Sequence, residues 1–258
     1  LGNEKLRFYQ LVDMRHKIDL NCDMGEGIGN ESELIEYIST ASIACGGHAG
    51  DAVSMEECIR LAQIYRKKLG PHPSYPDQAN FGRVSMKLSE QAFKDALRDQ
   101  LSQFFGIAEQ LNAKVSHIKP HGALYNDMYS NVDLCIAFVE LVEEFQKDLH
   151  IFCQPGSQLG KIAPLYGFEI KYEGFADRRY QQDGSLTSRK ESYALITEVE
   201  DLCKQVFDIA VNKEVETFDG IKIPMHVQTL CLHGDSPNAL IFASSLNRFL
   251  KENNIDLA

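Results

Sequence analysis

The sequence predicts a closed (β/α) barrel of seven strands with an irregular outline. Strand-like runs alternate with longer helical patterns about seven times, and no linker-like gap interrupts the series. Almost every strand-like run also ends in a polar, glycine-rich cluster. Repeated β-α units with apolar, β-branched strands are typical of a parallel sheet covered by helices. A doubly wound open sheet would satisfy the same pattern, but seven units in one unbroken series favour the barrel.

Short apolar runs predict the strands, and apolar residues at helical spacing predict the helices. We expect strands over 17–21, 40–45, 68–72, 114–119, 150–154, 168–173 and 227–233, followed in turn by helices over 31–38, 54–68, 89–112, 132–147, 157–167, 192–212 and 236–253. Asn30 is the expected N-cap of the first helix, and Ser54 with Glu57 fits a capping box. Ser236 followed by Pro237 fits an N-cap and first-turn pair.

We expect a single barrel domain over 17–258, an N-terminal extension over 1–16, and an inserted loop or hairpin at 213–226. A chain of 258 residues with 44% hydrophobic and 24% charged residues is typical of a globular protein. The extension lacks the apolar core of a secretory signal, and no apolar stretch approaches the ~20 residues that span a bilayer. A formal net charge of −11 argues against nucleic acid as a main partner.

The seven cysteines are an odd, scattered set without a C-x-x-C motif. This pattern argues against a disulfide framework or a zinc ribbon and favours reduced thiols in a cytoplasmic protein. A nucleophilic role for Cys22, Cys45 or Cys231 is a minor alternative, because small buried cysteines are common near strand ends.

Polar clusters follow the predicted strands in a regular way. They are DLNCDMGEG (19–27), CGGHAGD (45–51), PHPSYPD (71–77), KPHGALYN (119–126), QPGS (154–157), EGFADRRY (173–180) and HGD (233–235). In parallel α/β folds the carboxyl ends of the strands carry the active site. We therefore expect these segments to meet at one mouth of the barrel.

Four of the eight histidines, His48, His72, His121 and His233, lie in these clusters beside glycine or proline. A single histidine is more often a core residue or a loop cap, but four at corresponding strand ends indicate a common site. Histidine serves as an acid, a base or a metal ligand near neutral pH.

Charged residues in the same clusters suggest further roles. Asp19, Asn21 and Asp23 alternate along the first strand, so they point to one side, where burial is costly unless they bind one another, a metal or a ligand. Capping and turn roles are the alternative for Asp23 and Glu26.

Basic side chains indicate an anion site. Arg178 beside Asp177 could clamp a carboxylate or phosphate, whereas Arg179 fits a surface salt bridge. Lys119 could stabilise developing negative charge.

Several familiar motifs are absent. GEGIGN (25–30) lacks the dinucleotide-binding spacing, and GSQLGKI (156–162) lacks the spacing and the hydroxyl residue of a phosphate-binding loop. No autonomous Walker-type ATP site is visible. Neither H-E-x-x-H nor G-x-S-x-G occurs, which argues against a zincin protease and a serine hydrolase.

Taken in chain order, the clusters resemble the LamB/YcsF family. The matching segments are DLNCDMGEG, SIACGGHAGD, HPSYPD, FGR (81–83), KPHGALYN, EGFADRRYQQDGSL (173–186) and HGD, which span about residues 18 to 240. The sequence departs from the family pattern at Ser42, Pro71 and Val84 and near 192–194. Family members begin just before the first strand, so we expect Met14 to be the natural start.

The resemblance implies a barrel related to the glycoside hydrolase and deacetylase barrels. It also implies the 5-oxoprolinase reaction, 5-oxo-L-proline + ATP + water → L-glutamate + ADP + phosphate, carried out with two partner subunits, B and C. The expected substrate is 5-oxoproline or a related lactam, with ATP and Mg²⁺ as co-substrate. The ring of histidine and carboxylate side chains would also suit a divalent metal, which the sequence does not identify.

The candidate site residues fall into two groups. We expect catalytic roles for Asp19, Asp23, His48, His72, His121, Asp177 and His233, and roles in binding substrate or phosphate for Asn21, Glu26, Asp51, Lys119, Arg178 and Asp235. Two other functions stay open: a metal-dependent amide or ester hydrolase that acts alone, and a non-catalytic subunit that binds the lactam or organises the complex. The sequence is also compatible with a homo-oligomer.

Overall fold

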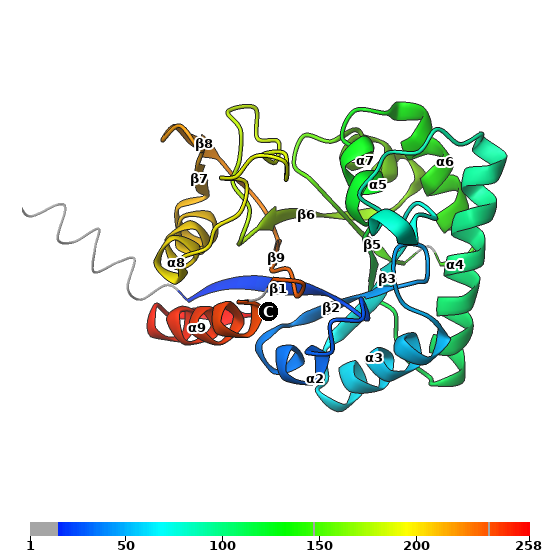
Figure 1. Cartoon of the computed structure of the whole chain (residues 1–258), viewed down its shortest axis with the longest axis horizontal. Helices are drawn as coiled ribbons and strands as arrows, with labels where there is room; N and C mark the ends of the chain where they lie inside the picture. Colours follow the sequence, from blue (N-terminus) through cyan, green and yellow to red (C-terminus); the bar gives the residue numbers. More distant parts are fainter. Residues whose placement is uncertain (1–14, 147, 237) are drawn as a thin grey trace, which may run out of the picture.

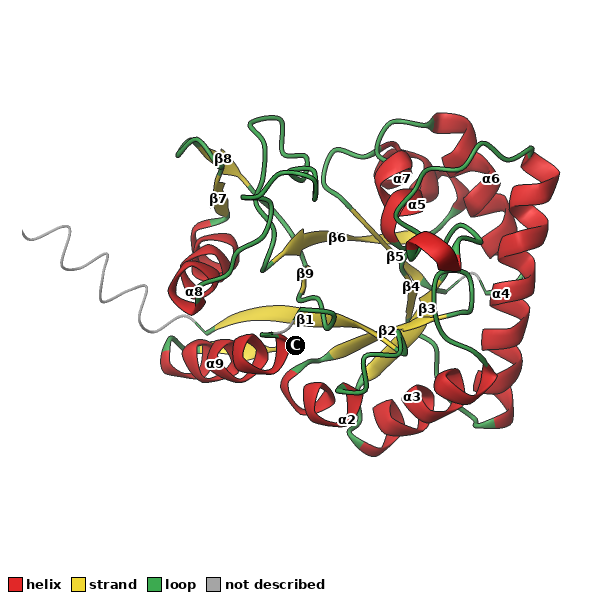
Figure 2. Cartoon of the chain, viewed as in Figure 1, coloured by secondary structure: helices red, strands yellow, loops and turns green. Residues whose placement is uncertain are grey.

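The structure is a computed structural model that describes residues 15–146, 148–236 and 238–258. The strands are β1 (His16–Met24), β2 (Thr40–Ala44), β3 (Lys68–His72), β4 (His117–Ile118), β5 (His150–Cys153), β6 (Glu169–Phe175), β7 (Glu214–Glu216), β8 (Lys222–Pro224), β9 (Thr229–Cys231) and β10 (Ile255–Leu257). Seven of them form a parallel sheet in the order β3-β2-β1-β9-β6-β5-β4, with the helices outside it (Figures 1 and 2). The predicted seven-stranded (β/α) barrel is therefore confirmed.

The barrel is nearly closed between β3 and β4. Leu69 forms a single parallel bridge with Val115, and its carbonyl accepts a hydrogen bond of 2.9 Å from the Ser116 N–H. The Lys119 N–H donates to the Pro71 carbonyl at 3.1 Å. At the end of the barrel where the strands begin, β10 pairs with the start of β1. His16 therefore belongs to the sheet and not to the predicted extension. Arg15, which precedes His16, pairs with Asp256 at 3.8 Å. Residues 1–14 of the predicted extension, including Met14, lie outside the described residues.

The helices are α2 (Glu31–Leu34), α3 (Ala52–Ile64), α4 (Glu90–Gln110), α5 (Gly122–Asp127), α6 (Val132–Glu143), α7 (Gln158–Ile162), α8 (Val199–Phe207) and α9 (Ala239–Glu252). Short 3-10 turns at Ile35–Tyr37, Gln78–Asn80 and Ala163–Tyr166 and a π turn at Asp208–Asn212 complete them. Within the described residues, no helix is long and apolar enough to cross a membrane.

The longest helix shows why the sequence pattern works. α4 begins after Ser89, whose side chain accepts a hydrogen bond from the Ala92 N–H. Its buried side chains recur three or four residues apart and include Phe93, Leu97 and Phe104. This spacing places them on one face against the core.

Several predicted helix boundaries are wrong. α3 begins at Ala52 because Asp51, three residues before Ser54, forms the capping box with it; the predicted pair of Ser54 and Glu57 does not. Asn30 does precede α2, but its side chain donates to the Gly234 carbonyl instead of capping the helix. The N-cap of α9 is Asn238 and not Ser236; Pro237 lies outside the described residues.

The predicted helix over 192–212 is much shorter than expected. Residues 192–198 are irregular because their backbone bonds to the segment after β6: the Ile196 N–H donates to the Asp177 carbonyl, and Leu195 bridges to Arg178. The insert at 213–226 is a hairpin of β7 and β8, as expected.

The inside of the barrel is polar near β1. Ile18, Leu20 and Cys22 pack in the hydrophobic core, while Asp19 and Asn21, on the alternate face, bond to polar side chains of neighbouring strands. The predicted alternation along this strand is confirmed. β1 therefore presents a column of polar side chains that leads toward the carboxyl ends of the strands.

A substitution at Gly70 tests how closely β3 and β4 approach each other. A Cβ at this position would lie 2.0 Å from the carbonyl oxygen of His117. We expect Gly70→Ala to lower the free energy of unfolding by about 1–3 kcal/mol or more, because the two strands must move apart. Gly106→Ala in α4, where a Cβ meets no atom within 4 Å, should instead stabilise by about 0.5–1 kcal/mol. Urea unfolding of both variants measures the contrast; equal stability of the two would contradict this account of the closure.

Candidate active site

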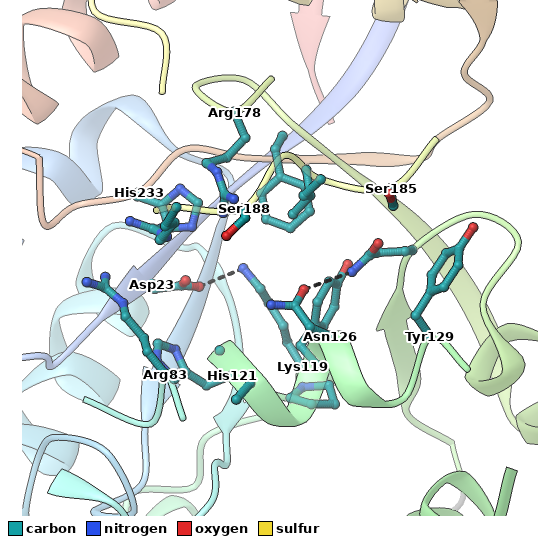
Figure 3. A pocket seen from close by; sticks show the side chains of 18 of the residues that line it. Asp23, Arg83, Lys119, His121, Asn126, Tyr129, Arg178, Ser185, Ser188 and His233 are labelled. Atoms are coloured by element: carbon teal, nitrogen blue, oxygen red, sulfur yellow. Dashed lines mark hydrogen bonds and ion pairs between the residues drawn. The ribbon is translucent and has the colours of Figure 1, made fainter. Parts of the chain in front are cut away.

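A pocket of about 580 Å³ opens at the carboxyl ends of the strands. Figure 3 shows Asp23 and Lys119 facing each other within it, with His233 and Arg178 to one side and Asn126 to the other. These residues come from β1, from the segments after β4, β6 and β9, and from α5. The expected convergence of distant polar clusters at one mouth is therefore what the structure displays.

Lys119 is the centre of the pocket floor. Its ammonium group lies 2.7 Å from Asp23 Oδ1 and 3.0 Å from Glu173 Oε1. It also donates to Asn21 Oδ1 at 3.1 Å and lies 3.2 Å from Cys231 Sγ. All of these side chains are buried, so the charged groups depend for compensation on one another and on His72, 3.3 Å from Asp23.

The attraction between these opposite charges sets the protonation of Lys119 and Asp23. Burial alone would lower the pKa of Lys119, but the negative charges of Asp23 and Glu173 hold it well above its ordinary value. Burial would likewise raise the pKa of Asp23, but His72 and Lys119 hold it well below its ordinary value. The ion pair therefore stays charged, and the pocket floor carries a fixed positive group.

A second cluster lies beside the ion pair. His48 Nε2 is 2.9 Å from Glu26 Oε1, and His121 Nδ1 is 2.9 Å from His72 Nε2 and 3.5 Å from Glu26 Oε1. His72 Nε2 is also 3.3 Å from Asp23 Oδ2, which links the cluster to the floor. Burial, together with the negative charge of Asp23, raises the pKa of Glu26 to about 7. Burial lowers the pKa of His48 to about 4 and that of His121 in the same direction.

The arrangement of these groups suits a metal ion. One ligand atom from each of Glu26, His48, His72 and His121 lies within 4.8 Å of the others. Among the described residues, Asp23, Cys231 and His233 form a second group with the same property. Imidazole nitrogens with a carboxylate oxygen are donors that divalent transition metals accept.

His233 forms a dyad with Asp177. Its Nδ1 lies 2.9 Å and 3.0 Å from the two carboxylate oxygens, and its backbone N–H donates to the same group at 3.2 Å. An Nδ1–H that donates to Asp177 leaves Nε2 as the basic nitrogen of the neutral ring. Phe175 stacks against the imidazole with ring centroids 5.7 Å apart. The geometry is that of an oriented general base.

Arg178 supplies a buried guanidinium with a spare donor. One terminal nitrogen donates to the Thr187 carbonyl at 2.7 Å, but within the part of the chain that the structure describes the buried Nε has no hydrogen-bond partner. Burial and the positive charge of Arg189 lower the pKa of Arg178 to about 10, although Asp177 opposes this effect. Two guanidinium groups that line one pocket and repel each other form a natural anion site.

The structure does not bring every predicted residue to the pocket. Asp19 lies deeper in the barrel, where it accepts hydrogen bonds of 2.7 Å from Thr40 and Thr229. Asp51 is exposed and caps α3. Asn21 lies below the floor and binds Lys119, and the Asp235 carboxylate pairs at the rim with Arg83. The placements of Asp19 and Asp51 give no support to the roles expected for them, because their polar atoms are satisfied by the protein itself.

Some pocket residues were missed by sequence reasoning. Glu173 holds Lys119 from β6, and Arg83 and Arg189 line the pocket. Glu173 and Arg83 stand in segments singled out above. Glu173 opens the cluster EGFADRRY at the end of the predicted strand over 168–173, and this position could have indicated it. Arg189 belongs to an irregular segment whose course across the mouth no local pattern indicates.

The cysteines are all free and buried, as expected. Burial raises the pKa of Cys22, Cys45 and Cys231 above the ordinary thiol value. The nucleophilic alternative loses support because a thiolate is disfavoured at each position.

Comparison with known proteins gives a consistent assignment. The model of the LamB/YcsF family matches residues 18–258. The chain is 40% identical over 250 residues to the A subunit of 5-oxoprolinase from Methylococcus capsulatus, covering 95% of this chain and 96% of that protein. It is 38% identical over 247 residues to the protein of the same name from Bordetella parapertussis, covering 94% and 98%. The crystal structure of the lactam utilization protein from Thermus thermophilus superposes with a TM-score of 0.87 at 29% identity, covering 93% of this chain and 98% of that one.

Removal of the Lys119 charge should expose the cost of the buried carboxylates. We expect Lys119→Met to lower the free energy of unfolding by about 3–5 kcal/mol, because Asp23 and Glu173 lose their counter-charge. Adding Asp23→Asn to this variant should restore part of the loss. Urea unfolding measures both; an Asp23→Asn substitution that destabilised Lys119→Met further would contradict the assigned pairing.

The dyad predicts a pH dependence of stability. Burial would raise the pKa of Asp177, but the charge and N–H donors of His233, with Arg178, hold it below its ordinary value. A depressed folded-state pKa contributes stability above the unfolded value of about 4, and this contribution is lost as the pH falls through the folded value. We expect Asp177→Asn to be less stable than the wild type at pH 7 and the difference to shrink below about pH 4. Urea unfolding across pH measures it.

Asp201→Asn is the matched control. Asp201 pairs with Arg179 at 2.7 Å near the surface, so its loss should cost only about 0–1 kcal/mol at pH 7. If the difference in free energy of unfolding between the wild type and Asp177→Asn grew as the pH fell, the expected direction of the pH dependence would be wrong.

Proposed function

Because the chain belongs to the LamB/YcsF family, we propose that it is the A subunit of an ATP-dependent 5-oxoprolinase that opens the lactam of 5-oxo-L-proline to L-glutamate. The relatives that bear the name of this 5-oxoprolinase component support the proposal. The observation that carries it is the guanidinium of Arg178, whose buried Nε finds no partner among the described residues, on the wall of the pocket that His233 also lines. An anion site beside an oriented base suits a small substrate that has both a carboxylate and a carbonyl to be attacked by water.

The substrate carboxylate is assigned to Arg178. The Nε and Nη donors of a guanidinium match two carboxylate oxygens, and Arg189 adds positive charge nearby. A pocket of about 580 Å³ has ample room for a five-membered ring. This anchoring would leave the lactam carbonyl toward Lys119 and His233.

The chemistry requires activation, because a lactam is an unactivated amide. In the proposed sequence the lactam oxygen attacks the γ-phosphorus of ATP, and ADP leaves with the electrons of the broken P–O bond. Water then adds to the ring carbon, the C–N bond breaks as the nitrogen takes a proton, and the resulting acyl phosphate is hydrolysed to glutamate and phosphate. These steps need a base, an acid and a cation near the phosphoryl oxygens.

His233 is assigned the proton transfers. Its Nε2 would take the proton from the attacking water and return it to the departing ring nitrogen, while Asp177 fixes the tautomer and stabilises the charged ring. Lys119 acts by charge alone, because its ammonium group already binds Asn21, Asp23 and Glu173. A fixed buried cation stabilises developing negative charge with little reorganisation.

We assign the phosphoryl transfer, with ATP and Mg²⁺, to the assembled complex with partner subunits B and C. The sequence has no Walker-type motif that would bind ATP autonomously. A second candidate, a metal-dependent hydrolase that acts alone, is favoured by the cluster of Glu26, His48, His72 and His121. The two differ in their need for ATP and for the partners.

The decisive measurement is glutamate release from 5-oxoproline by the chain with and without ATP and the two partner subunits. We expect release only with all components present. In the complete system His233→Asn should lower kcat by about 10²–10⁴-fold, because the base is lost. Arg178→Lys should mainly raise KM, because a lysine cannot bind a carboxylate with two parallel bonds.

Arg179→Lys is the matched control for the arginine, since Arg179 pairs outward with Asp201; its kinetics should stay close to wild type. ATP-independent hydrolysis by the chain alone would favour the second candidate. Full activity of His233→Asn in the complete system would overturn the assigned roles.

A further inference from the structure

We propose that His72 Nε2, His121 Nδ1 and the Glu26 carboxylate bind one divalent transition-metal ion, with His48 as a support for Glu26. The starting observation is that the hydrogen bonds of two histidines leave two lone pairs facing each other. His72 Nδ1 lies 2.7 Å from the Lys119 carbonyl, and His121 Nε2 lies 3.0 Å from the Phe81 carbonyl. A carbonyl only accepts, so both of these nitrogens must carry hydrogen.

The other two nitrogens then face each other. In the neutral rings His72 Nε2 and His121 Nδ1 both present lone pairs, yet they lie only 2.9 Å apart. Two acceptors at this distance repel each other unless a proton or a metal ion lies between or beside them. Glu26 Oε1, 3.5 Å from His121 Nδ1, adds a third lone pair that can bind a metal ion, and it brings a negative charge to the same side.

Ring orientation selects the ligands. The His72 and His121 rings are perpendicular, with an interplanar angle of 90°, so that their in-plane lone pairs can meet at one point. The His48 and His121 rings are stacked, with centroids 3.6 Å apart and an angle of 2°. Lone pairs in two parallel planes cannot reach the same ion. His48 therefore serves through its Nε2, 2.9 Å from Glu26 Oε1, as a group that orients the carboxylate.

The distances match a small ion. Metal–ligand bonds of about 2.0–2.1 Å place tetrahedral ligand atoms roughly 3.3 Å apart. The distances from His121 Nδ1 to His72 Nε2 and to Glu26 Oε1, 2.9 and 3.5 Å, bracket that value, and the ligand atoms of the cluster all lie within 4.8 Å of one another. Two histidines and one glutamate are a ligand set of the zinc class, which leaves a fourth position for water or substrate. His121 lines the pocket, so this open position would face the substrate.

Metal content tests the proposal independently of turnover. Purified protein is stripped with a chelator, incubated with Zn²⁺ or Co²⁺, desalted and assayed for bound metal, with the visible spectrum of the Co²⁺ form as a second readout. We expect one equivalent and the absorption of a four- or five-coordinate site. The same measurement can succeed while glutamate release fails, which separates this proposal from the proposed function.

Two variants delete a ligand nitrogen but keep its backbone hydrogen bond. In His72→Asn the amide can still donate to the Lys119 carbonyl, and in His121→Gln the amide can still donate to the Phe81 carbonyl. Each should weaken metal binding at least 100-fold, while His48→Ala should keep the site with about 10–100-fold weaker affinity. His226→Ala, at an exposed histidine, is the matched control and should bind as the wild type does.

Circular dichroism confirms that each variant is folded. No bound equivalent in the wild type would overturn the proposal and leave a proton shared between the two rings as the explanation of their contact. Stoichiometric binding that persisted in both His72→Asn and His121→Gln would overturn it as well.

Discussion

The buried ammonium group of Lys119 is the constraint on which the rest of the site depends. It follows β4 and binds Asn21 and Asp23 on β1 and Glu173 on β6, so three parts of the barrel wall meet at one charge. A charge in a low-dielectric interior is tolerated only with complete compensation. The contacts therefore fix how the strands stand relative to one another at the mouth, and they hold a cation in place before any substrate arrives.

The polar interior has an energetic cost that a purely apolar barrel would avoid. Buried ion pairs are often no more stabilising than apolar packing of the same volume. Asp19 with its hydroxyl partners and the ion pair above it nevertheless form a continuous polar column along β1. In a binding site such pre-ordered charges reduce the reorganisation required when negative charge develops. Under the proposed function, the barrel is less stable than an apolar one would be, but its buried charges are already in place to stabilise the negative charge that develops in the reaction.

The barrel and much of its mouth could be predicted from the sequence because both follow local patterns. Alternating β-α units determine the fold class, and strand-end clusters bring His72, His121 and His233 to one face. Helix caps were less predictable, since Asp51 and Ser54 differ from the expected pair by a shift of three residues. Asp19 was misplaced because residues on one face of a strand can lie at different depths. The course of 181–198 depends on tertiary contacts, such as the stacking of Tyr193 on Phe218 at 3.6 Å, that no short pattern encodes.

The mouth consists of two chemically different halves joined by one carboxylate. One half, from the segments after β1 to β4, gathers Glu26 and three histidines; the other, from the segments after β6 and β9, gathers His233, Asp177 and two arginines. Asp23 lies between them, 3.3 Å from His72 and 2.7 Å from Lys119. Its ionisation is favoured by positive charge from either side, so a cation added to the histidine half would further hold Asp23 as a carboxylate, and the same cation would repel the ammonium group of Lys119. The two halves are thus electrostatically coupled through Asp23, so a change of charge in one half alters the electrostatic environment of the other.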